Sequence, residues 1–185
     1  MTQLTREDWL DRGLHMIAEQ GVEAVTIATL CRDLGVTKGS FYHHFKNQKV
    51  FLDSVLAHWE AEYTSRFIDE SNTGEGVYER LQKLNALVIE SFGQYEVHIR
   101  AWAQADPMAQ AYQARVDARR IAYLQDLYRE LLGDDAQARA MAHLVYTTLI
   151  GSTSVIPPLT TADFAQMTAL FEPLVNALLA DKPDE

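Results

Sequence analysis

Apolar residues recur at intervals of three and four along most of the chain, and this spacing predicts helices rather than strands. Between residues 48 and 70 an apolar or aromatic residue recurs every four positions, which is typical of a long amphipathic helix; these are Phe51, Val55, Trp59, Tyr63 and Phe67. The sequence contains no alternating runs of apolar and polar residues bounded by turns, which would indicate strands. The chain is therefore expected to be all-α.

Capping residues and glycines mark where these helices begin and end. Thr5, Thr26, Thr37 and Asn47 each precede an apolar run, as N-cap residues do, and Gly21 follows the first run as a stop. A polar, glycine-containing linker at residues 71–76 is expected to be a domain boundary, and two prolines at 157 and 158 end a later helix. Together these signals predict about nine helices, at residues 5–20, 27–34, 38–45, 48–70, 81–92, 95–104, 106–132, 135–155 and 160–180.

The segment from 26 to 45 fits a helix-turn-helix, in which two short helices are joined by a turn that contains glycine. Gly35 allows the sharp turn, and Val36 can fill the angle between the helices. Phe41 and Phe45 are four residues apart, so both rings lie on one face of the second helix and are expected to point into the core.

The remaining faces of that second helix carry groups that suit a DNA duplex. Glycine permits close approach, serine can bond a base edge, and tyrosine, histidine and lysine can reach phosphates. Thr37 would begin the helix with its backbone N–H groups directed at the DNA. The exposed set is Lys38, Gly39, Ser40, Tyr42, His43, His44 and Lys46.

Net charge alone argues against a nucleic-acid partner, because the 185-residue chain carries a formal charge of −10 and has a pI near 5.0. The distribution of charge changes this interpretation. Residues 1–50 are neutral overall, and residues 26–50 contain four basic residues and one acidic residue. A small basic patch is therefore expected in an otherwise acidic protein.

The single cysteine, Cys31, cannot form an internal disulfide, which fits a reducing compartment. The N-terminus lacks the basic and apolar regions of a signal peptide, and polar residues and prolines interrupt the longest apolar stretch, residues 144–159. We therefore expect a cytoplasmic protein with no membrane partner.

Residues 5–56 resemble the N-terminal domain of the TetR family of transcriptional regulators, most densely in the run GVTKGSFYHHFKNQKVFL. Cys31 departs from the small residue usual in the second helix, and a buried thiol can fill the same space. The resemblance implies a DNA-binding domain at residues 1–50 and a helical ligand-binding and dimerisation domain at residues 51–185. It places these residues at or near the operator: Thr26, Thr37, Lys38, Gly39, Ser40, Tyr42, His43, His44, Lys46 and Lys49.

The same resemblance implies a homodimer that binds a near-palindromic DNA operator, with its last two long helices joined in a four-helix bundle. Periodicity shows that a side chain is buried but not whether it packs against a second copy or its own chain, so these side chains could instead face the core of their own subunit. Pro173 is expected to bend the last helix. The expected interface residues are Leu144, Thr148, Gly151, Phe164, Met167, Phe171, Leu174 and Leu178.

Aromatic and histidine residues of the middle helices can line an apolar ligand cavity, although the same rings could equally be ordinary core. Trp102 and His98 are the strongest candidates, because the family plan places their short helix under the fourth helix. The full set is Phe92, Tyr95, His98, Trp102, Tyr112, Tyr123, His143 and Tyr146.

These features together predict a dimeric repressor that a small-molecule ligand releases from its operator. The alternatives are a regulator that binds no ligand and a helical adaptor that binds other proteins. Hydrolase, metalloprotease and phosphate-loop motifs are absent from the sequence, so no enzymatic activity and no cofactor are expected. No metal site is expected at His43 and His44, because adjacent side chains on a helix diverge by about 100°.

Overall fold

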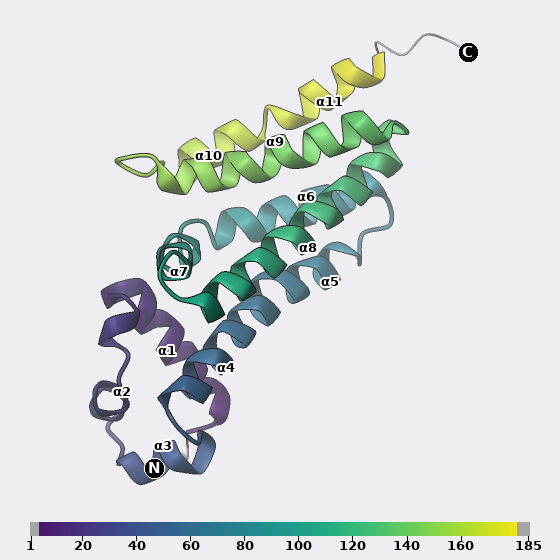
Figure 1. Ribbon diagram of the computed structural model, residues 1–185. Coiled ribbons are helices and arrows are strands. Elements are labelled where there is room, and N and C mark those ends of the chain that lie inside the picture. Colours follow the sequence, from purple (N-terminus) through teal and green to yellow (C-terminus); the bar gives the residue numbers. More distant parts are fainter. Residues whose placement is uncertain (1–3, 181–185) are drawn as a thin grey trace. The chain divides into compact units, whose positions relative to one another are not determined.

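Helices account for most of residues 4–180, which are the residues that the computed structural model describes (Figure 1). No strand occurs within this range, and the predicted all-α class is confirmed. The helices are α1 (Arg6–Gln20), α2 (Ile27–Asp33), α3 (Lys38–His44), α4 (Gln48–Glu60), α5 (Arg66–Ser71), α6 (Val77–Glu90), α7 (Glu96–Ala103), α8 (Pro107–Leu132), α9 (Asp135–Ser154), α10 (Thr161–Thr168) and α11 (Phe171–Ala180).

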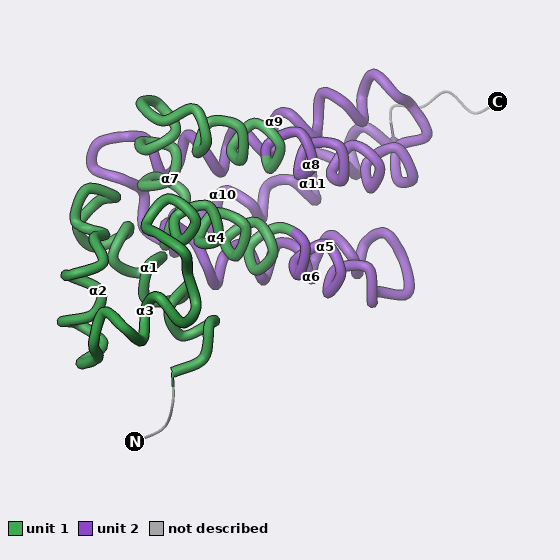
Figure 2. Tube along the Cα trace, turned by 60° about the horizontal axis from the view of Figure 1, so that its bottom comes forward, with its two compact units in different colours: residues 1–64, 94–116 green, residues 65–93, 117–185 purple. Residues whose placement is uncertain are grey.

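The chain divides into two compact units, coloured separately in Figure 2. Unit 1 contains residues 1–64 and 94–116, and unit 2 contains residues 65–93 and 117–185. Residues 94–116, which form α7 and the first part of α8, therefore cluster with the N-terminal helices. The division into a DNA-binding domain at 1–50 and a second domain at 51–185 concerns function, and it stays a prediction.

Close packing of α1 on α4 builds the centre of unit 1. Gly13 lies in the middle of α1, and a Cβ atom added there would come within 2.6 Å of the Phe51 ring and 3.0 Å of Val55. Glycine is unfavourable inside a helix by about 1 kcal/mol relative to alanine, so its presence here is explained by this close approach.

Two predicted helices differ from expectation in their interiors. The helix predicted at 48–70 contains a π-helical turn, Ala61–Ser65, between α4 and α5. The helix predicted at 160–180 is interrupted at Ala169 and Leu170. This interruption lies three to four residues before Pro173. A proline ring collides with the preceding helical turn, and proline has no N–H to donate to a carbonyl of that turn. The eleven segments thus correspond to the nine predicted helices.

Tyrosine hydroxyl groups join helices within unit 2. The hydroxyl of Tyr146 on α9 donates to Asp117 Oδ1 of α8 at 2.6 Å. The hydroxyl of Tyr123 on α8 lies 2.9 Å from Ser71 Oγ and 2.8 Å from Asn72 Oδ1, at the end of α5. These bonds position the second part of α8 against its neighbours in the unit.

None of the helices formed by residues 4–180 is both long enough and apolar enough to span a membrane.

Candidate nucleic-acid interface

The turn between α2 and α3 has the geometry that the sequence predicts for a helix-turn-helix. Gly35 adopts a φ of +66°, a conformation that side chains with a Cβ rarely tolerate. Val36 follows, half-buried against the core of unit 1, and its N–H donates to the carbonyl of Cys31 at 2.9 Å. The direction of α3 is therefore set by a backbone turn and an apolar plug.

Aromatic rings hold the inner face of α3. Phe41 is fully buried, and its ring centroid lies 5.6 Å from that of Trp9, 5.4 Å from that of Phe45 and 5.6 Å from that of Phe51. The pairs with Trp9 and Phe51 are edge-on and the pair with Phe45 is tilted. Edge-on aromatic pairs contribute about 0.5–1.5 kcal/mol each beyond simple burial. The predicted inward direction of Phe41 and Phe45 is confirmed.

The opposite face of α3 presents the polar residues expected there. Tyr42 is 57% exposed although its neighbour Phe41 is fully buried. Ser40 and His44 are half-buried, and the remaining members are exposed: Thr37, Lys38, Gly39, His43, Lys46 and Lys49. Lys38 begins α3, Lys46 lies between α3 and α4, and Lys49 lies in the first turn of α4, so the exposed lysines are close together in the sequence.

Two threonines that were predicted as helix caps differ in how their hydroxyl groups are used. Thr26 forms a reciprocal capping box with Thr29 at the start of α2. Thr37 occupies the N-cap position of α3, but its side chain makes no capping hydrogen bond. The predicted N-cap position of Thr37 is therefore confirmed, and the residue is exposed.

Two polar contacts that the sequence does not reveal hold the ends of the motif. The Arg6 guanidinium lies 5.0 Å from the centroid of the Phe45 ring, and its Nη2 donates to Ser54 Oγ on α4 at 2.7 Å. Gln48 at the start of α4 donates from Nε2 to the carbonyl of Val25 at 2.8 Å. These contacts fix the first turn of α4 and the end of α3 relative to α1 and α2.

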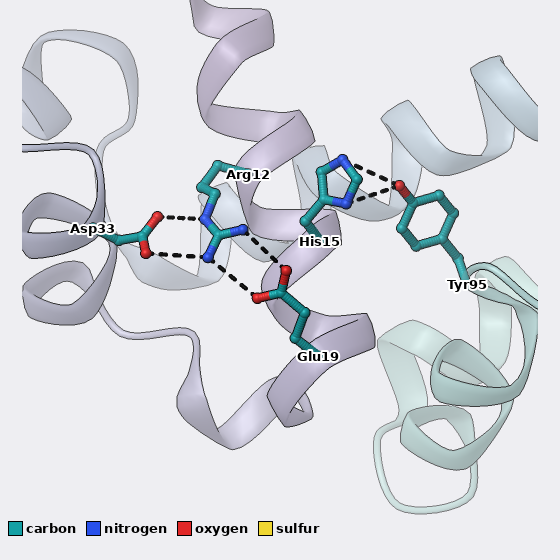
Figure 3. A network of polar contacts seen from close by, with 5 residues as sticks. All are labelled: Arg12, His15, Glu19, Asp33 and Tyr95. Carbon is teal, nitrogen blue, oxygen red and sulfur yellow. Dashed lines mark hydrogen bonds and ion pairs between the residues drawn. The ribbon is translucent and has the colours of Figure 1, made fainter.

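Arg12 on α1 pairs with two carboxylates, Glu19 on the same helix and Asp33 at the end of α2, and the bond to Asp33 joins the two helices (Figure 3). Its Nη2 lies 3.1 Å from Asp33 Oδ1 and 3.2 Å from Glu19 Oε2, and its Nε also donates to Asp33. The hydrogen bonds that Arg12 donates to Asp33 and, with a smaller effect, to Glu19 raise the pKa of Arg12. Asp33 is the one acid of the basic segment, and its charge is paired with Arg12.

Burial in α2 raises the pKa of the Cys31 thiol, and the charge of Lys38 partly offsets the increase. The thiol therefore remains protonated at neutral pH. Cys31 is 5% exposed and packs in the core of unit 1, as its position in a helical face predicts.

The predicted ligand-binding residues fall into two groups. Tyr95, His98, Trp102 and Tyr112 belong to unit 1, whereas Phe92, Tyr123, His143 and Tyr146 belong to unit 2. Tyr95 and Trp102 lie in the unit 1 core, and His143 is exposed on α9.

Several hydroxyl groups of the predicted ligand set take part in contacts between helices. The Tyr95 hydroxyl lies 3.2 Å from His15 Nδ1 (Figure 3). Burial is the largest cause of the raised pKa of Tyr95, so its hydroxyl stays protonated. The Tyr112 hydroxyl donates to Asp53 Oδ1 on α4 at 3.1 Å, and the Arg115 guanidinium lies 4.4 Å from the Tyr112 ring centroid. The Tyr95 hydroxyl thus contacts α1, and the Tyr112 hydroxyl contacts α4.

The predicted interface residues also divide by exposure. Leu144, Gly151, Met167 and Leu174 are exposed. Thr148, Phe171 and Leu178 are half-buried. Phe164 is buried and its ring is stacked on that of Phe92 at 4.3 Å, so it packs within its own chain.

Within residues 4–180 no group of three or more histidine, cysteine, aspartate or glutamate side chains is placed to hold a metal ion.

Known proteins match this part of the chain. Residues 10–55 match the family described as bacterial regulatory proteins, tetR family. The repressor NemR of Escherichia coli K12 is 32% identical over 74 residues, which cover 40% of this chain and 37% of NemR. The repressor KstR2 of Mycobacterium tuberculosis H37Rv is 30% identical over 93 residues, which cover 50% of this chain and 45% of KstR2. The matches thus span less than half of either relative.

Solved structures extend the similarity of fold over the remaining helices. KstR2 of Mycobacterium tuberculosis superposes with a TM-score of 0.65 at 20% identity, covering 100% of this chain and 98% of that one. A regulator from Saccharomonospora viridis in complex with choline superposes with a TM-score of 0.71 at 16% identity, covering 96% of each chain. At these identities the likeness establishes the fold alone.

Proposed function

We propose that the chain is a member of the TetR family of bacterial regulatory proteins, whose model residues 10–55 match, and that it is a transcriptional repressor that binds a DNA operator as a homodimer. Its relatives NemR and KstR2 are named as transcriptional repressors. The observation that carries the proposal is the two-sided character of α3. One side is locked into an aromatic core by Phe41, and the other exposes Lys38, Tyr42 and His43.

The chemistry of this exposed side matches the surface of a duplex. Lys38, Lys46 and Lys49 can neutralise phosphates, and each neutralised phosphate contributes about −0.9 to the slope of log affinity against log salt. Ser40 and Tyr42 can bond base edges or phosphates. An adaptor that binds proteins would give no reason for this concentration of bases and hydroxyl groups on one helix of an acidic chain.

A dimer is proposed because one copy offers few phosphate contacts. Two-fold symmetry doubles these contacts and places two α3 helices about 34 Å apart, one turn of DNA, over a near-palindromic site. An interface on this part of unit 2 is supported by four exposed residues: Leu144 and Gly151 on α9, Met167 on α10 and Leu174 on α11.

The experiment that tests the proposal is selection of genomic DNA fragments by the purified protein, with recovery of the bound sequences. We expect fragments that share one near-palindromic sequence, bound less tightly as salt is raised. A variant carrying both Lys38→Ala and Tyr42→Ala, two exposed positions, is the control, and it should enrich none of them. Equal enrichment by the variant, or recovery of no common sequence, would contradict the proposal.

We further infer that a small apolar or amphipathic molecule releases the protein from DNA. Support comes from the family, in which ligand binding is typical, and from the Saccharomonospora viridis neighbour, which was solved with choline. A ligand shifts an equilibrium only through different affinity for two states, so it must prefer a form whose α3 helices do not match successive major grooves. The run of helical residues 48–71 links the two units in sequence and is the proposed lever.

Reciprocity gives this mechanism a direct check. A coupling of about 1–3 kcal/mol, or 5- to 150-fold in affinity, is enough for a switch, and the operator must weaken ligand binding by the same factor. Metabolites can be titrated against the free protein and the operator complex, following tryptophan fluorescence and DNA release together. A ligand that binds both forms equally would contradict the mechanism for that ligand.

A further inference from the structure

The lysine and arginine side chains of unit 1 fall into two sets according to their contacts. Four of them bond to other side chains of the unit, and these are Arg6, Arg12, Arg100 and Arg115. Another four are exposed and form no hydrogen bond or ion pair with any residue from 4 to 180, namely Arg32, Lys38, Lys46 and Lys49. All of the unpaired lysine and arginine side chains that the structure describes in unit 1 thus lie within residues 26–50.

Arg32, in the last turn of α2, is the only member of this second set outside the residues that the family resemblance places at the operator. Its own helix offers it no salt bridge, because none of the residues three or four positions away is acidic. The adjacent acid, Asp33, is bound instead by Arg12 of α1, which Figure 3 shows reaching across to it. The guanidinium of Arg32 therefore has its donors available for a partner outside the chain.

The contacts of α2 determine which way Arg32 points. Successive residues of an α-helix are turned by about 100°, so Arg32 lies about 160° around the helix from Leu30, which is fully buried. Arg32 shares its side of α2 with Ala28, which lies one turn earlier and is also exposed. Asp33 lies about 140° around the helix from Ala28 and faces α1 through its bond to Arg12. The side formed by Ala28 and Arg32 thus points away from the core and away from α1.

The first turn of α3 lies toward this same side of α2. Burial raises the pKa of the Cys31 thiol and the charge of Lys38 partly offsets the increase, so Lys38 lies near Cys31. Cys31 is only about 60° around the helix from Ala28, but it is about 160° from Asp33. Lys38 is therefore nearer the Ala28 side of α2, and Arg32 extends the basic surface of α3 onto α2.

In a helix-turn-helix the second helix enters the major groove of DNA while the first crosses the sugar–phosphate backbone. Resting on the DNA binding of the proposed function, we propose that Arg32 binds a phosphate of the operator from α2, beside the groove that α3 enters. A guanidinium suits this contact because its planar fork can donate two hydrogen bonds to one phosphate. Phosphates carry no sequence information, so Arg32 adds affinity and fixes the position of α3 without selecting bases.

Arg12 protects this contact from the one nearby acid. Asp33 is the only acidic residue between 26 and 50, and an unpaired carboxylate beside Arg32 would repel a phosphate. Arg12 holds this carboxylate with two donors, Nη2 to Asp33 Oδ1 at 3.1 Å and Nε to the other oxygen. Because the Asp33 charge is neutralised on the α1 side, a phosphate meets Arg32 with no unpaired acid next to it.

The slope of log affinity against log salt tests the assignment. Fluorescence anisotropy of a labelled fragment recovered by selection gives the affinity of the full chain at a series of salt concentrations. Arg32→Gln should bind at least about tenfold more weakly at low salt, because a dimer loses two charge-assisted contacts. Its slope should be shallower by about 1.8, which is about 0.9 for each of two phosphates. Selection with Arg32→Gln should recover the same sequence as the parent chain.

Two further variants separate the charge of Arg32 from any structural role. Arg32→Lys keeps the charge and should keep the parent slope. Arg66→Gln removes the same charge from α5, where Arg66 pairs with Glu70, and should leave both the affinity and the slope unchanged. Because Arg32 is exposed, urea unfolding of Arg32→Gln should match that of the parent chain.

The outcomes distinguish this contact from the function on which it rests. A parent slope in Arg32→Gln, or a slope that Arg32→Lys reduces equally, would overturn the phosphate contact and leave DNA binding intact. A changed sequence preference in Arg32→Gln would show that Arg32 contacts a base, and it would overturn the contact as well. If the parent chain selects no DNA, both proposals fail.

Discussion

Replacing Phe41 with alanine is expected to lower the free energy of unfolding by about 3–5 kcal/mol, whereas the same change at Tyr42 should alter it by less than about 0.5 kcal/mol. Phe41 is fully buried among Trp9, Phe45 and Phe51, so its removal leaves a cavity. Tyr42 is 57% exposed. Urea unfolding followed by circular dichroism measures both values.

DNA affinity should respond to the two changes for different reasons. Tyr42→Ala should bind the selected fragment about tenfold more weakly with an unchanged fold, because only a contact of the exposed face is lost. Phe41→Ala should lose binding in step with the loss of folded protein. Wild-type affinity in Tyr42→Ala would show that this face of α3 does not meet DNA, and a stable Phe41→Ala variant would contradict the aromatic core.

Leu144→Asp is expected to convert the protein to monomers and to lower its affinity for the operator by at least about 100-fold. An unpaired carboxylate buried in a symmetric interface would be present twice and would cost several kcal/mol. A monomer then loses the gain of about 100-fold or more that comes from binding two linked half-sites together. Light scattering gives the mass, and fluorescence anisotropy with labelled operator gives the affinity.

Tyr78→Asp is the matched control for this change. Tyr78 and Leu144 are each 43% exposed in unit 2, but Tyr78 lies on α6 and outside the predicted interface. Its variant should remain dimeric and bind DNA normally. A dimeric Leu144→Asp protein with normal affinity would place the interface on another surface.

Periodicity predicted the helices well because burial repeats with the turn of the helix, but it did not reveal irregular turns. The spacing of exactly four residues from Phe51 to Phe67 drifts by about 40° per step on a regular α-helix. The π-helical turn at Ala61–Ser65 has more residues per turn and reduces that drift. The spacing therefore contained a signal for the π turn that the prediction of a uniform helix overlooked.

Long-range polar contacts could not be predicted from the sequence. The bonds from Tyr95 to His15 and from Tyr112 to Asp53 join residues 80 and 59 positions apart. Nothing local distinguishes these tyrosines from rings that line a ligand cavity. The close packing at Gly13 was easier to predict from the sequence, since a glycine inside an amphipathic helix indicates that another backbone or ring comes close. The exposed face of α3 was predictable because two phenylalanines four residues apart fix the inward side.

The most direct test of the central claim, that two copies of α3 read one DNA site, is hydroxyl-radical footprinting of the protein on a fragment recovered by selection. We predict two protected segments related by two-fold symmetry, with centres about one helical turn of DNA apart. The same fragment with Tyr42→Ala should require higher protein concentrations for the same pattern. Protection of a single segment, or protection without symmetry that Tyr42→Ala leaves unchanged, would contradict the account.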